Sequence, residues 1–164
     1  MKRILLFSIL SFISVITYSQ GFNQAIGIRG GYSSGFEYRW YQSDIDSYKL
    51  LLSARNHGVQ LHALKEFHRY DLFDFAYQIV CYYGFGIHGG YESWNVLHYN
   101  GYNRWYSSRA SVIVGLDGLA GLEYVFDTAP ISAGFEVKPF FDLLGRKTFD
   151  LQLFDFAFTI KYLF

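Results

Sequence analysis

The clearest pattern in the chain is the alternation of its last twelve residues between two kinds of side chain. Large apolar or aromatic side chains stand at every even position from Phe154 to Phe164, and the odd positions include Asp155, Ala157, Thr159 and Lys161. A period of two places these two sets on opposite faces of a β-strand. The apolar face needs a second sheet in a soluble protein, or lipid in a membrane barrel whose polar face lines the interior.

Seven earlier segments alternate in the same way, with varying clarity: residues 23–32, 35–42, 48–55, 58–69, 76–91, 109–126 and 131–141. Pro139 interrupts the seventh of them, so we expect fraying or a bulge there. With residues 153–164 the number of strands is eight, the smallest usual number in outer-membrane barrels. The predicted fold class is therefore all-β: a transmembrane, antiparallel up-and-down β-barrel of eight strands.

Composition agrees with a membrane β-protein. Aromatic residues make up 21% of the chain and charged residues only 17%, against about 25% charged residues in ordinary soluble domains. The abundance of aromatic residues excludes a disordered chain. The formal net charge is zero, which speaks against a nucleic acid as partner. Cys81 is the only cysteine, so no disulfide can form within the chain.

The N-terminus has the pattern of a secretory signal peptide. Lys2 and Arg3 precede an apolar run, and Thr17 and Ser19 supply small residues before Gln20. We therefore expect residues 1–19 to be a signal peptide and residues 20–164 to form one outer-membrane barrel domain; the alternative is a buried N-terminal helix. The apolar run is shorter than the ~20 residues of a spanning helix, and no later stretch is long enough. Backbone polar groups inside lipid then require a closed barrel.

The inward face of the predicted barrel carries charges of both signs. We expect a polar network in the lumen formed by Arg29, Glu37, Arg39, Arg55, His62, Glu66, His88, Asp117, Glu123, Glu136, Lys138, Asp155 and Lys161, with Lys49 on the same face. The interior of an eight-stranded barrel is just wide enough to be filled by side chains. Paired charges would plug it, whereas unpaired charges would carry a severe desolvation cost. An ion or proton pathway is the alternative.

Histidines on the inward face raise the question of a metal. His62 and His68 are six residues apart, or about 20 Å along a strand, so they cannot share an ion. A site would need His88 or Glu66 from a neighbouring strand at matching height. We expect hydrogen bonding here, and neither a metal nor a cofactor.

The longest predicted connection lies outside the membrane, between the fifth and sixth strands. It contains Asn100-Gly101, a strong hairpin signal, so we expect residues 96–99 and 102–105 to pair as a surface hairpin. Enzymatic small barrels use a histidine, a serine and an acid near the membrane surface. The candidates for such roles are the external residues His57, Glu92, His98, Ser107 and Ser108. No spacing joins them into a triad, so we predict no catalytic residues and a chain that is not an enzyme.

The alternating aromatic C-terminus, with Tyr162 and Phe164, resembles the signal that bacterial barrel-assembly machinery recognises. Four stretches resemble, in order, small outer-membrane β-barrel proteins of Gram-negative bacteria: GVQLHALKEFH (58–68), YYGFGIHGG (82–90), VGLDGLAGLEYVF (114–126) and APISAGFEVKP (129–139). The resemblance covers residues 24–164. It implies an eight-stranded barrel in the cell outer membrane, with outer-membrane lipid and the assembly machinery as partners, and we expect a monomer. It implies no activity.

These observations lead to one main expectation and three alternatives. We expect a non-enzymatic barrel with a plugged lumen that serves envelope integrity or surface contact through its external hairpin. A lipid-modifying barrel enzyme, a narrow channel and a soluble periplasmic sandwich are the other interpretations of the same alternation.

Overall fold

The computed structural model describes residues 22–55, 58–70, 72–73, 76–145 and 149–164. The predicted signal peptide and the candidate residue His57 lie outside these residues. The strands are β1 (Gln24–Gly31), β2 (Ser34–Ser43), β3 (Asp46–Arg55), β4 (Gly58–Arg69), β5 (Ile79–Tyr99), β6 (Arg104–Val125), β7 (Ile131–Val137), β8 (Phe140–Leu144), β9 (Asp150–Gln152) and β10 (Phe156–Leu163). Among the described residues, no helix has the length and apolar character needed to cross a membrane.

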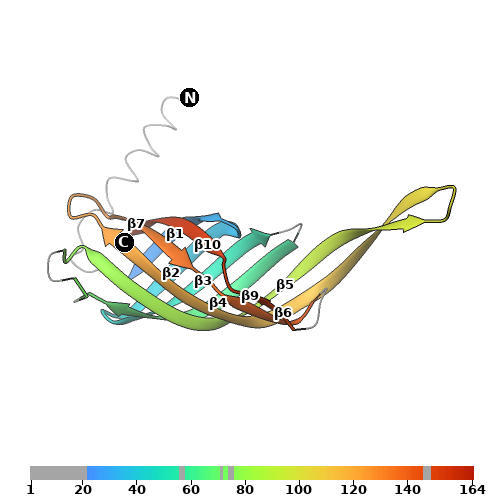
Figure 1. The fold of residues 1–164 in the computed structure, drawn as a ribbon. Coiled ribbons are helices and arrows are strands. Elements are labelled where there is room, and N and C mark those ends of the chain that lie inside the picture. Colours follow the sequence, from blue (N-terminus) through green and yellow to red (C-terminus); the bar gives the residue numbers. More distant parts are fainter. Residues whose placement is uncertain (1–21, 56–57, 71, 74–75, 146–148) are drawn as a thin grey trace, which may run out of the picture.

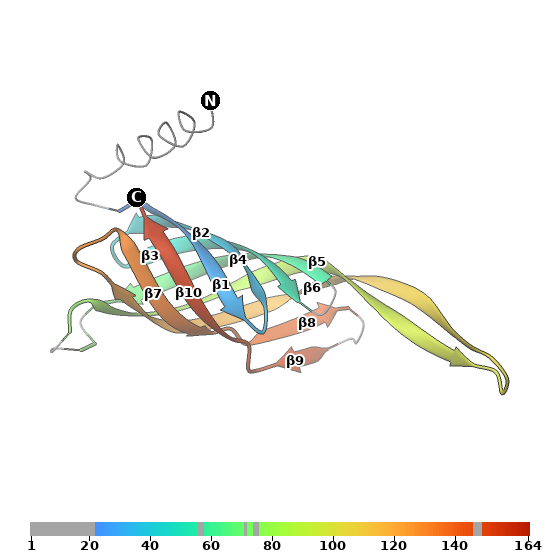
Figure 2. The same ribbon diagram turned by 90° about the horizontal axis from the view of Figure 1, so that it is seen from above.

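The strands form an antiparallel, up-and-down ring. Each strand from β1 to β6 pairs with the next one along the chain. Strand β10 pairs with β7 on one side and with β1 on the other, which completes a ring of eight. Figures 1 and 2 show the strands wrapped around a common axis, with both termini of the described chain at one end. This confirms the predicted all-β, eight-stranded, up-and-down architecture.

The seventh and eighth strands of the ring are both interrupted: β8 follows β7 after Pro139, where an interruption was predicted, and the predicted strand 153–164 begins only at Phe156. Strand β7 pairs with residues 120–125 of β6, and β8 pairs with residues 114–117. The break falls at Pro139, which has no N–H for the ladder; its carbonyl instead accepts a hydrogen bond of 2.7 Å from the Gly118 N–H. Directly opposite, β9 ends at Gln152 and β10 begins only at Phe156. The interruption predicted at the proline thus extends to the neighbouring strand.

The alternation read from the sequence decides which side chains point inward. In β10, Phe158 is 70% exposed on the outer face while its neighbours Ala157 and Thr159 are 2% and 1% exposed inside. Every strand of the ring repeats this inversion, with large apolar side chains outside and polar or charged ones inside. Hydrophobic side chains are also buried, among them Leu51, Ile113 and Phe140, and Leu64, Tyr82 and Leu119 form a cluster.

Strands β5 and β6 continue well past the rest of the ring. The last pair between β4 and β5 joins Gly58 to Glu92, but β5 and β6 remain paired as far as Tyr99 and Arg104. We call residues 93–110 the surface hairpin; its seven residue pairs would reach roughly 23 Å beyond the ring at ~3.3 Å per residue. Figure 1 shows it as the yellow arm that projects from the end opposite the termini.

The tip of the surface hairpin differs from the predicted two-residue turn. Because Tyr99 pairs with Arg104, the loop holds four residues, 100–103, and Tyr102 lies in the loop instead of in a strand. A tight Asn-Gly turn of type I′ needs positive φ at both central residues. Here Gly101 has φ +63°, whereas Asn100 is not among the described residues with positive φ.

Candidate functional site in the barrel interior

The predicted network residues all lie inside the ring. All of them are buried except Arg55, which is half-buried at the end of β3. They come from every strand of the ring and from the breaks beside β7 and β10, so that residues distant in sequence meet across the lumen. The arrangement of the strands in the ring decides which charged side chains form contacts. These contacts divide into three groups along the axis of the ring.

The group nearest the termini is built around Arg39 on β2. Its Nε lies 2.6 Å from Glu66 Oε2 on β4, and its Nη1 lies 2.8 Å from Glu123 Oε2 on β6. The same Glu123 oxygen accepts a hydrogen bond of 2.9 Å from Lys161 Nζ on β10. Lys161 also lies 3.3 Å from Glu37 Oε1. Two bases and three acids therefore interlock across four strands and the width of the lumen.

The middle group centres on Glu136 of β7. Its Oε1 accepts a bond of 2.6 Å from Arg29 Nε, and its Oε2 accepts bonds of 2.8 Å from Lys49 Nζ and 3.0 Å from the Tyr82 hydroxyl. Lys49 also lies 2.6 Å from Glu37 Oε2, which connects this group to the group around Arg39. Tyr82 is fully buried and was missed by our sequence analysis. Tyr82 and His88 both stand at even positions of the same strand, so the alternation places both side chains on the inward face.

The third group lies toward the hairpin end and holds the histidines. Asp117 of β6 lies 2.8 Å from His62 Nδ1, 3.1 Å from His88 Nδ1 and 3.5 Å from Lys138 Nζ. Lys138 continues to Asp155 at 3.4 Å, in the break before β10. The three groups thus join through ion pairs, because Asp155 also lies 3.2 Å from Arg29 of the middle group.

Asp142 on β8 ends the network at the hairpin end. Its carboxylate lies 2.9 Å from His88 Nε2 and 3.4 Å from Arg55 Nη2. Asp142 was not predicted to belong to the network, because the seventh strand was expected to end at residue 141. The break at Pro139 keeps the strand direction, and the alternation resumes on β8 with Phe140 and Asp142 inward.

The arrangement fills the lumen with matched charges. Isolated buried ions carry a penalty of several kcal/mol each, which close pairing and hydrogen bonds must offset. Each of the network's charged side chains named above has an opposite charge, or a histidine facing a carboxylate, within 4 Å. Chemically, the interior is suited to hold charge in fixed positions.

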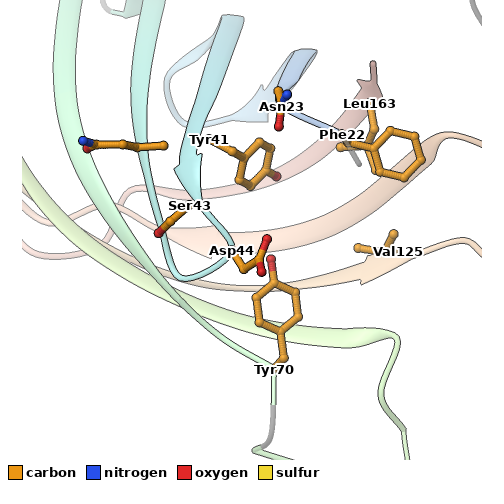
Figure 3. A pocket seen from close by; sticks show the side chains of 9 residues that line it. Phe22, Asn23, Tyr41, Ser43, Asp44, Tyr70, Val125 and Leu163 are labelled. Carbon is orange, nitrogen blue, oxygen red and sulfur yellow. The ribbon is translucent and has the colours of Figure 1, made fainter. Parts of the chain in front are cut away.

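A pocket opens at the termini end of the ring (Figure 3). It is a cavity of about 190 Å³ lined by Phe22, Asn23, Tyr41, Gln42, Ser43, Asp44, Tyr70, Val125 and Leu163. The Tyr70 hydroxyl points toward the Asp44 carboxylate in Figure 3. Tyr70 lies just outside β4, where partial burial raises the pKa of its hydroxyl.

Two of the external polar residues meet on the surface hairpin. His98 Nε2 lies 2.8 Å from Ser107 Oγ, and the His98 ring stacks on Trp105 with centroids 5.5 Å apart. Glu92 is six residues from His98 on the same strand, or about 20 Å, so it cannot complete a triad with this pair. The structure therefore brings together a histidine and a serine but not the acid.

Comparison with known proteins reveals a shared fold. No family model matches the chain, and no curated protein sequence matches it. Among solved structures, it is similar to the N-terminal β-barrel domain of OprF from Pseudomonas aeruginosa, with a TM-score of 0.52 and 14% sequence identity. The match covers 88% of this chain and 100% of that domain. At this identity the likeness shows a β-barrel fold and no more.

Proposed function

We propose that the chain is a small outer-membrane β-barrel without enzymatic activity, which serves the envelope as a sealed structural element and carries one surface hairpin for contact outside. The observation that carries this proposal is the inversion of the two faces. Charged side chains fill the inside of the ring, while Phe36, Phe85 and Phe158 are 64–70% exposed on the outside.

The exposed apolar faces support a lipid environment. Soluble monomers seldom expose contiguous apolar patches larger than a few hundred Å², and here large apolar side chains cover the outer face of strand after strand. The strands of the ring pair with their neighbours, with β10 joined to both β7 and β1, and such pairing is what a structure needs to cross lipid with strands. A soluble sandwich would need a second sheet over these faces, and the described residues supply none.

The matched charges support a sealed lumen over a channel. Ions passing through would have to break contacts such as Arg39–Glu66 and Lys49–Glu37, both at 2.6 Å. The ring of eight leaves an interior of about the width that side chains fill. We therefore expect no steady conductance from the folded barrel.

The first test combines fractionation with gel migration. The protein should be recovered from the outer-membrane fraction and should migrate differently on SDS gels with and without boiling. The refolded barrel should show no discrete conductance in planar bilayers. Recovery as a soluble protein after osmotic shock would contradict the barrel, and regular conductance steps would favour the channel.

The assembly signal can be tested at the C-terminus. The Phe164 N–H donates to the Gln24 carbonyl at 2.9 Å, but its side chain is 38% exposed. Phe164→Ser should therefore lower the amount of protein in the outer membrane while leaving refolding in detergent nearly unchanged. The Tyr162→Ser variant should act in the same direction. Equal loss in both settings would mean that the aromatic end only stabilises the barrel.

A lipid-modifying enzyme is the second candidate, favoured by the contact between His98 and Ser107. A nucleophilic serine needs a base within hydrogen-bond reach, and this pair meets that condition at 2.8 Å. The test compares lipid A mass spectra of strains with the wild type, with Ser107→Ala and with the gene deleted. A lipid species that changes equally in the last two strains would support the enzyme, and three identical profiles would oppose it.

A further inference from the structure

We propose that His62, His88 and Asp117 form a binding site for one divalent transition-metal ion, such as Zn²⁺, inside the barrel. Two imidazoles and a carboxylate are a donor set that such ions favour. The three side chains come from β4, β5 and β6, are all buried, and each offers a ligand atom within 4.8 Å of the others. The proposal concerns the interior and does not depend on how the outer face is used.

The distances are close to those of a metal centre. The two Nδ1 atoms lie 2.8 Å and 3.1 Å from the two oxygens of Asp117. Ligand atoms held at about 2.0–2.1 Å from a tetrahedral zinc are roughly 3.3 Å apart. To admit an ion, these two nitrogen–oxygen distances would lengthen by about 0.2–0.5 Å.

The strand register builds this cluster in one row. His62 pairs directly with His88, His88 pairs with Gly115, and Gly115 pairs with Asp142 on β8. A Cβ at Gly115 would lie 2.5 Å from His88 Cε1, so only glycine leaves room for the imidazole. Asp117 stands two residues further along the same inward face. This satisfies the condition set by the sequence: a second histidine from the neighbouring strand at matching height.

Partners beyond the ligands already fix the two rings. The Ser53 hydroxyl lies 2.9 Å from His62 Nε2, and Asp142 Oδ1 lies 2.9 Å from His88 Nε2. In metal sites the second ring nitrogen of a ligating histidine is held in this way by a hydroxyl, carbonyl or carboxylate, which directs the other nitrogen toward the ion. Both rings thus present Nδ1 to the same carboxylate.

Charge and access also fit one cation. Lys138 lies 3.5 Å from Asp117 Oδ1 and can remain as a hydrogen-bond donor to the ligating carboxylate. The side chains of Arg55 and Asp142 are 3.4 Å apart and each 8% exposed, which makes them the most exposed ion pair of the network. An ion would enter past this pair.

The test titrates the full refolded barrel with Co²⁺ and Zn²⁺ in detergent, after gel migration has shown that the barrel is folded. Wild type should bind one ion per chain, with visible Co²⁺ absorption bands that Zn²⁺ abolishes. His62→Gln and His88→Gln should each weaken binding at least ~100-fold, and Ser53→Ala about 10-fold through lost orientation of the ring. His98→Gln, on the surface hairpin, is the matched control and should bind like wild type.

The results separate a metal site from a plain hydrogen-bond network. A folded wild-type barrel that shows no saturable binding at one ion per chain would overturn the proposal. So would His62→Gln and His88→Gln variants that bind as tightly as the His98→Gln control. If either interior variant does not refold, the wild-type stoichiometry and Co²⁺ spectrum decide by themselves. Failure of the gel-migration test would instead count against the barrel.

Discussion

Replacing Glu136 with glutamine should destabilise the barrel by about 3 kcal/mol. The carboxylate accepts bonds from Arg29, Lys49 and Tyr82 at 2.6, 2.8 and 3.0 Å. Removing one partner of a buried ion pair costs about 3–5 kcal/mol, because the other charge stays buried. The lower end applies here, since Arg29 keeps Asp155 at 3.2 Å and Lys49 keeps a second carboxylate at 2.6 Å.

Urea unfolding of the refolded barrel, followed by gel migration and tryptophan fluorescence, measures this loss. With a slope of about 2 kcal/mol per molar urea, the midpoint should fall by about 1.5 M. Asp127→Asn removes a carboxylate from an exposed turn and is the control. The double variant Glu136→Gln/Lys49→Met removes one charge of each sign, so it should lose less than the sum of its two single variants. A midpoint for Glu136→Gln equal to that of Asp127→Asn would refute the claim that paired charges hold the lumen together.

Three further outcomes follow from the geometry. Gly115→Ala should cost about 1–3 kcal/mol, because its Cβ would clash with the Phe141 carbonyl oxygen as well as with His88. Gly30→Ala, whose Cβ meets nothing within 4 Å, should unfold close to wild type. Tyr82→Phe should cost about 1–2 kcal/mol through the lost bond to its buried carboxylate, measured by the same urea titration; no change would mean that the hydroxyl is not needed there. Excision of the surface hairpin should leave the shift on boiling intact, since no strand other than β5 and β6 pairs within it; a barrel that no longer refolds would show that the hairpin is part of the folding unit.

The sequence was sufficient to place the strands and their faces. Successive Cβ atoms of a strand point to opposite sides, so the alternation from Phe154 to Phe164 by itself assigns Asp155 and Lys161 to the inside. The missing N–H of Pro139 predicted the interruption there. Sequence patterns failed at the strand ends, at Asp142 and at Tyr102, because pairing with the neighbouring strand decides where a ladder stops.

The contacts inside the lumen could not be read from the chain. Arg29 contacts Glu136, which is 107 positions away in the sequence. This contact depends on the register in which β10 pairs with β1 on one side and with β7 on the other. His62 and His88 face each other only because β4 and β5 pair in one particular register. The sequence therefore determined which residues are inside, since that depends on the geometry of single strands. The tertiary structure decided which of them meet, because a shift of one strand by two residues keeps every face and changes every partner.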